Sequence, residues 1–226
     1  MKNNCRYPLI SLIVPFIILI IGCKQQQEGI VTDIDGNVYH TVRIGTQVWM
    51  VENLKVTRYQ NGDLIPDVKD TAQWRYLPIG TYCSYNNEIQ NTAVYGRLYN
   101  WYAVTDKRNI APKGWHVPSF SEIELLIANL GGDTVAAGRM KEAGNSHWLY
   151  PNTGAGAQNS LIALPGGYRH SNDGSFHTMG SNGYWWTTTQ SYEMYAWSRR
   201  VYSYFANAMN VHDYKSFGFS VRCVKD

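Results

Sequence analysis

Residues 114–130, GWHVPSFSEIELLIANL, join a short strand to an amphipathic helix, and this junction decides the fold we expect. Trp115 and Val117 alternate with His116, which is typical of a strand. Pro118 ends that strand, because proline offers no N–H and keeps the preceding residue extended. The junction therefore predicts a buried strand that leads directly into a helix.

The helix should begin with a capping box, formed by Ser119 with Glu122 or by Ser121 with Glu124. Its apolar residues follow the i, i+3, i+4, i+7 spacing of one helix face: Ile123, Leu126, Ile127 and Leu130. Two glycines after Leu130 supply the stop. We expect this face to pack on aromatic strands from the end of the chain, near Trp185 and Val221.

The first residues have the pattern of a secretory signal peptide. Lys2 and Arg6 precede an apolar run, residues 9–21, that is short for a membrane-spanning helix. Residues 20–23, Ile-Ile-Gly-Cys, resemble the lipobox of bacterial lipoproteins, in which the cysteine is acylated and becomes the first mature residue. The alternative is an uncleaved anchor with an incidental cysteine.

This pattern divides the chain into a signal peptide (residues 1–22), a polar tether (23–29) and a single domain (30–226). Lipid on Cys23 would place the protein in the bacterial cell envelope, on the outer membrane, facing either the periplasm or the outside. The membrane is then one partner.

The charge balance argues against a nucleic-acid partner. Removing residues 1–22 takes away two of the 20 basic residues and none of the 17 acidic ones, which leaves a net charge of +1. A nucleic-acid binder would need a strongly basic face.

Two cysteines remain in the predicted domain, because Cys5 leaves with the signal peptide and Cys23 carries lipid. An even number of cysteines in an exported protein suggests a disulfide, here between Cys83 and Cys223. Two buried free thiols are the alternative.

Apolar and polar residues alternate near both ends of the chain, as they do in strands. Asp35-Gly36 between residues 30–34 and 38–44 predicts a hairpin, and residues 47–51 a third strand that is covered on both faces. Residues 95–104 have the spacing of a helix. The last quarter, from residue 183, is expected to form sheet.

Seven motifs resemble the Fibrobacter succinogenes major paralogous domain family. They lie at residues 35–39, 47–54, 95–101, 111–118, 163–169, 183–187 and 218–223. The family is in turn distantly similar to the C-type-lectin-like fold of formylglycine-generating enzymes. The resemblance implies an α+β fold with small, mostly antiparallel sheets, two to three short helices and long loops. Some members carry a cysteine where Ala111 stands here, so the disulfide partner stays open.

No catalytic residue, metal ligand or cofactor site is predicted. The chain has neither a Gly-x-Ser-x-Gly elbow nor a His-Glu-x-x-His helix. His116 and the helix carboxylates are interpreted as structural, and neither domain cysteine lies in the motif of the formylglycine-generating enzymes. Asp33 and Asp35 suggest a calcium loop only superficially, and we interpret them as part of a turn.

Binding is the function that the composition favours. Aromatic residues crowd the C-terminal part, and they offer rigid contact area to a sugar or a protein. We expect the tryptophans mostly in the core. The candidate ligand-binding residues are Tyr192, Tyr195, Trp197 and Arg199. An enzyme acting on surface polymers and a structural part of the envelope or of a fimbria remain the alternatives.

Overall fold

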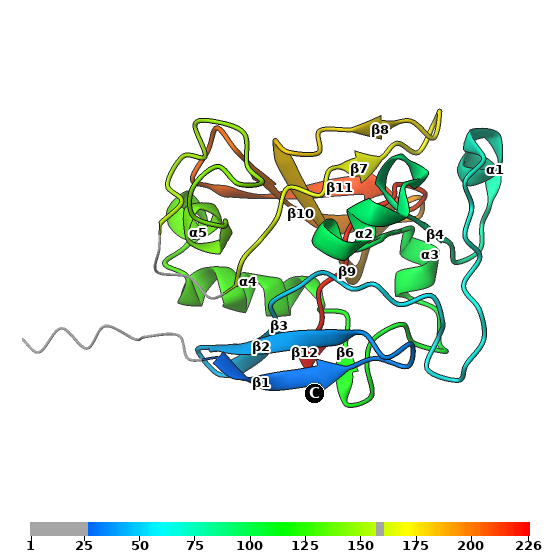
Figure 1. The fold of residues 1–226 in the computed structure, drawn as a ribbon, viewed down its shortest axis with the longest axis horizontal. Helices are drawn as coiled ribbons and strands as arrows, with labels where there is room; N and C mark the ends of the chain where they lie inside the picture. Colours follow the sequence, from blue (N-terminus) through cyan, green and yellow to red (C-terminus); the bar gives the residue numbers. More distant parts are fainter. Residues whose placement is uncertain (1–26, 157–160) are drawn as a thin grey trace, which may run out of the picture.

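The computed structural model describes residues 27–156 and 161–226, which form an α+β fold with small antiparallel sheets (Figure 1). The strands are β1 (Gln27–Thr32), β2 (Val38–Ile44), β3 (Gln47–Met50), β4 (Tyr82–Cys83), β5 (Leu98–Tyr99), β6 (Trp115–His116), β7 (Tyr168–Arg169), β8 (Phe176–His177), β9 (Asn182–Tyr192), β10 (Tyr195–Tyr202), β11 (Ala208–Tyr214) and β12 (Val224–Lys225). The helices are α1 (Thr71–Tyr76), α2 (Ile89–Tyr95), α3 (Trp101–Val104), α4 (Phe120–Asn129) and α5 (Asp133–Met140), with a 3-10 turn at Tyr85–Asn87. The predicted fold class is confirmed, with more short helices in the described part than the two to three expected.

The two larger sheets are joined by residues 114–130. One sheet has the order β1-β2-β3-β12-β6, and the other has the order β11-β10-β9. β6 pairs with β12, so that His116 lies opposite Val224 at the far end of the chain. Helix α4 follows β6 and lies between the two sheets (Figure 1).

Helix α4 begins as the sequence predicts. Ser119 accepts a hydrogen bond from the N–H of Glu122, whose side chain accepts one from the N–H of Ser119. The four predicted apolar residues are all buried, and they share one core with Trp185: Ile123, Leu126, Ile127 and Leu130. Val221, by contrast, belongs to a different core.

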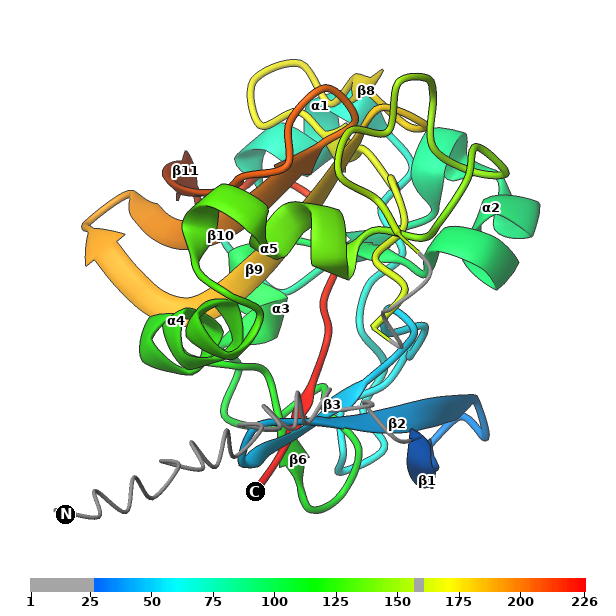
Figure 2. The same ribbon diagram turned by 90° about the vertical axis from the view of Figure 1, so that its left-hand side faces the viewer.

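Residues 217–225 separate the two main cores. Phe219, Val221 and Cys223 face the first core, with Trp115 and Trp186. Val224, on the alternate face, belongs to the second core, with α4. Figure 2 shows this segment running through the middle of the molecule to β12. A third, smaller cluster surrounds Trp74 and Cys83.

Two boundaries differ from the predictions. Residues 95–104 are not one helix, because Gly96 has a φ of +76° and ends α2, after which β5 intervenes before α3. The predicted tether is shorter than expected, since residues 27–29 already belong to β1. The signal peptide, the lipobox and Cys23 lie outside the described residues. None of the helices in the described ranges is long and apolar enough to span a membrane.

Candidate functional site

Six aromatic rings form a continuous surface on the β9–β11 sheet. We call this surface the aromatic platform; its residues are Phe120, Tyr192, Tyr195, Trp197, His212 and Tyr214. Strand pairing brings most of them together, because Tyr195 lies opposite both Tyr192 and Tyr214. Trp197, two residues after Tyr195 on β10 and on the same face, lies opposite His212. The sheet extends past α4 on this side (Figure 2).

Helix α4 supplies the sixth ring. Phe120 is the first residue of the helix, and its N–H donates to the hydroxyl of Thr189 on β9. This bond holds the Phe120 ring with its centroid 4.6 Å from that of Trp197, at an interplanar angle of 33°. The strand–proline–helix junction therefore positions one end of the platform.

The rings lie at packing distance along the whole platform. The Trp197 and His212 centroids are 3.8 Å apart, and those of Tyr195 and Tyr214 are 4.4 Å apart, with interplanar angles of 39° and 31°. Tyr192 contacts His212 at 5.3 Å. A hydrogen bond with Tyr214 raises the pKa of the Tyr195 hydroxyl. Most neighbouring rings are tilted by 31–43°, and Tyr192 lies at 89° to Tyr195, so the rings make a stepped surface with phenol groups at one end.

The outer part of the platform is exposed to solvent. Tyr192 is 64% exposed, His212 and Tyr214 are also exposed, and the remaining three rings are half-buried. The sequence predicted Tyr192, Tyr195 and Trp197, and the structure brings these three together. It missed Phe120, His212 and Tyr214. The alternation of residues 208–214 could have placed the last two on one face of a strand, although not beside Trp197.

The prediction that Arg199 binds a ligand is wrong, because its side chain is only 1% exposed and lies under α4 and α5. Its guanidinium donates to Glu124 on α4 at 2.7 Å and to Asp133 on α5 at 3.0 Å. Burial lowers its pKa, and the two carboxylates partly offset that effect. The residue therefore fastens α4 and α5 to β10 and does not reach the platform.

The predicted disulfide between Cys83 and Cys223 is also wrong. Both are free and buried, and they lie in different cores, the third and the first. Burial raises the pKa of the Cys83 thiol to about 12 and raises that of Cys223 as well. Burial therefore disfavours the thiolate of both residues, which is the form in which a cysteine acts as a nucleophile.

Several of the seven motifs from the sequence contribute residues to one buried hydrogen-bond network around Asn53. The side-chain oxygen of Asn53 accepts bonds from Trp185 Nε1 at 2.8 Å and from Arg222 at 3.1 Å. Its amide nitrogen donates to the carbonyl of Tyr95 at 2.8 Å. A side chain at Gly96 would collide with Asn53, since an added Cβ would lie 2.6 Å from the Asn53 Cβ. The network thus joins residues from four of the seven motifs inside the protein.

One serine lies within hydrogen-bond distance of a histidine in a way that could suggest catalysis. Ser175 Oγ is 2.6 Å from His177 Nε2 and also 2.6 Å from a carboxylate oxygen of Asp173. A carboxylate can only accept, so the serine proton goes to Asp173 and the histidine must donate to the serine. Asp173 also accepts the N–H of Ser175, as in an ordinary Asx turn. The arrangement stabilises a turn and does not activate the serine.

His116 likewise has a structural environment. Its ring nitrogens lie 2.7 Å from Asp226 and 2.8 Å from Glu122. Burial lowers the pKa of His116, but the two carboxylates outweigh it and the net shift is upward. The ring ties the start of α4 to the end of β12. Within the described ranges, no group of three or more His, Cys, Asp or Glu side chains is arranged to hold a metal ion.

A surface cleft of about 490 Å³ lies away from the platform, between residues 32–34 and 110–113. Two of its polar side chains, those of Asp33 and Gln60, already have hydrogen-bond partners. Asp33 accepts the hydroxyl of Tyr39, and the Gln60 amide donates to two carbonyls of the opposite wall.

Comparison with known proteins gives one match. The model of the Fibrobacter succinogenes major domain matches residues 42–225. Neither the comparison with curated proteins nor the comparison with solved structures found a match.

Proposed function

The chain belongs to the Fibrobacter succinogenes major domain family, and we propose that it is an acyl-anchored cell-envelope protein that binds carbohydrate chains on its aromatic platform. The observation that carries this proposal is the platform itself, with its adjoining rings and exposed outer edge. Family membership adds no activity of its own, so the proposal depends on the surface and on the N-terminal sequence.

The platform suits a sugar ring better than a charged ligand. Sugars present flat C–H faces that pack on aromatic rings, while phenol groups and the imidazole can exchange hydrogen bonds with their hydroxyls. Arg199, the candidate that would have attracted an anion, is buried. The C-type-lectin-like fold expected from the resemblance is in keeping with carbohydrate binding, and it remains a prediction.

The anchoring part of the proposal is supported by sequence alone. A basic start, an apolar run and Cys23 after Ile-Ile-Gly form the signal of an acylated protein. Two or more acyl chains give stable anchoring, since each buried methylene adds about 0.8 kcal/mol. The domain would then present its platform to polymers of the envelope or to those outside the cell.

Binding can be tested with the mature protein in detergent on an array of envelope and dietary polysaccharides, followed by calorimetry. We expect Trp197→Ala and Tyr192→Ala to weaken binding by tenfold or more. Tyr204→Ala is the matched control, because Tyr204 is 65% exposed, like Tyr192, but lies outside the platform. Equal binding by all three variants, or capture of a protein and no glycan, would reject the carbohydrate proposal.

Anchoring has a separate test. Radiolabelled palmitate should be incorporated into the native chain and not into Cys23→Ser, which should also leave the membrane fraction. Label in the variant, or none in the native chain, would contradict acylation at Cys23 without affecting the platform.

A further inference from the structure

A small internal cavity lies between α4, β3, β9 and the segment that separates the cores. Its volume is about 20 Å³, and most of its wall is apolar, including Trp49, Ile123 and Trp185. A cavity of this size holds one water-sized body, since about 10–15 Å³ is the minimum for a water molecule. Two of the residues that line it are arginines, Arg199 and Arg222.

Each of these arginines has one N–H group without a partner. Nε of Arg199 and Nε of Arg222 are both buried, and neither has a hydrogen-bond partner among the described residues. Buried donors of this kind are rare, because an unsatisfied group costs free energy that a bound molecule would recover. Two orphaned donors on residues that border the same cavity point to one shared acceptor.

The charge of Arg222 makes that acceptor an anion. Its other nitrogens donate to neutral oxygens, namely the carbonyls of Leu161 and Ile162 and the side chain of Asn53. Within the described residues, no carboxylate lies within salt-bridge distance of Arg222, and Glu52 acts on it only at longer range. Burial without a counter-charge lowers the pKa of Arg222 to about 10.

Arg199 provides the contrast within the same cavity. Two carboxylates, those of Glu124 and Asp133, already lie on its terminal nitrogens. The charge that remains uncompensated around the cavity is therefore that of Arg222. A buried cation with neutral partners is costly, and an anion that meets it inside the protein removes much of that cost.

We propose that this cavity binds one monatomic anion, chloride under physiological conditions, held by the Nε–H groups of Arg199 and Arg222. A volume of about 20 Å³ fits a single atom of this size better than sulfate or phosphate. The anion would lock α4 against β9 and residues 217–225. This role is independent of carbohydrate binding, because the platform lies on the surface and the cavity inside the second core.

The first test is thermal unfolding of the mature protein in sodium chloride, bromide and gluconate at one ionic strength. Chloride and bromide should raise the Tm in a saturable way and gluconate should not. Arg222→Met should lose this dependence, whereas Arg43→Gln should keep it, because Arg43 is half-exposed and paired with Glu28. If Arg222→Met does not fold, Arg222→Lys serves instead, with the expectation of weaker halide dependence.

The second test is crystallographic. Crystals grown in bromide should show an anomalous peak between the two arginines, and the Arg222 variant should not. An identical Tm in all three salts, or density at this position without anomalous signal, would overturn the proposal and leave water as the acceptor. Neither result would bear on the aromatic platform.

Discussion

Four cationic side chains are buried in the described part of the protein, and main-chain carbonyls accept many of their hydrogen bonds. They are Lys141, Arg169, Arg199 and Arg222. Arg169 shows the principle: it donates to carbonyls of Val68, Lys69 and Gly174 and lies over the Trp74 ring. Loops contain carbonyls that no strand or helix satisfies, so each buried cation fastens several loop segments at once.

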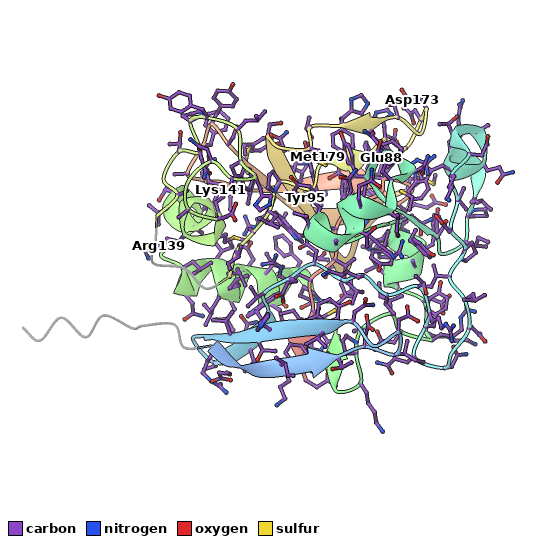
Figure 3. The ribbon with its side chains drawn as sticks, in the orientation of Figure 1. Glu88, Tyr95, Arg139, Lys141, Asp173 and Met179 are labelled. Atoms are coloured by element: carbon purple, nitrogen blue, oxygen red, sulfur yellow. The ribbon has the colours of Figure 1, made fainter. Side chains whose placement is uncertain are left out.

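Lys141 is the most constrained of the four. It follows α5 (Figure 3), and its ammonium donates to carbonyls of residues 153, 202, 203 and 205. Burial lowers its pKa from 10.5 to about 8. Between those two pH values the unfolded chain therefore binds more protons than the folded protein, and stability rises with pH.

Comparing the native protein with Lys141→Met isolates this effect. The variant should be less stable at pH 7, because it leaves carbonyls without donors. From pH 8 to 10.5 the native protein should gain about 1.4 kcal/mol per pH unit over the variant. Urea unfolding across this range measures the difference, and a gap that stays constant would contradict the lowered pKa.

Asn53 gives a second prediction at the residue scale. Asn53→Ala removes the acceptor of both Trp185 and Arg222. We expect a loss of about 2–6 kcal/mol in the free energy of unfolding, since each of the two buried donors left unsatisfied costs about 1–3 kcal/mol. Asn61→Ala, on an exposed turn, is the control and should change little. A similar loss in both variants would show that the network is not the cause.

At the scale of elements, α4 depends on a capping box that also contacts a strand. Glu122 accepts bonds from both the N–H and the hydroxyl of Ser119, and it lies 2.8 Å from His116. Burial raises the pKa of Glu122, but these hydrogen bonds outweigh it and lower the pKa. The cap, the strand and the helix are therefore one unit.

Ser119→Ala should reduce the free energy of unfolding by about 1 kcal/mol, the usual value of an N-cap. Ser121→Ala should reduce it less, because the structure forms the box with Ser119 and not with Ser121. Chemical denaturation of the two variants compares them directly. A larger loss for Ser121→Ala would assign the cap to the other serine.

At the scale of the whole molecule, the described residues form two main cores and a smaller third one, and Cys83 and Cys223 do not cross-link them. Iodoacetamide should leave Cys83 and Cys223 unmodified in the native protein, because both are buried. After unfolding without reductant, both should react. Mass spectrometry of the digested protein shows which cysteines are alkylated. If Cys83 and Cys223 react only after a reductant is added, the disulfide hypothesis would be restored.

The sequence predicted those parts of the fold that depend on neighbours along the chain. The hairpin before residue 44 and the capped helix after Pro118 follow from turn chemistry and apolar spacing. The prediction of one helix over residues 95–104 is wrong for a local reason. Their helical spacing is real, but Gly96 adopts a left-handed conformation where it packs on Asn53, and this ends the helix.

For the candidate site, the sequence by itself determined that Tyr195 and Trp197 would lie on one face of a strand, because side chains alternate with a period of two. Only the tertiary structure decided which neighbours completed the platform and which candidates were buried. Phe120 reaches Trp197 across 77 positions of the chain, and Arg199 is covered because α4 and α5 supply its carboxylates. Such contacts depend on how distant segments pack, and no local pattern records that.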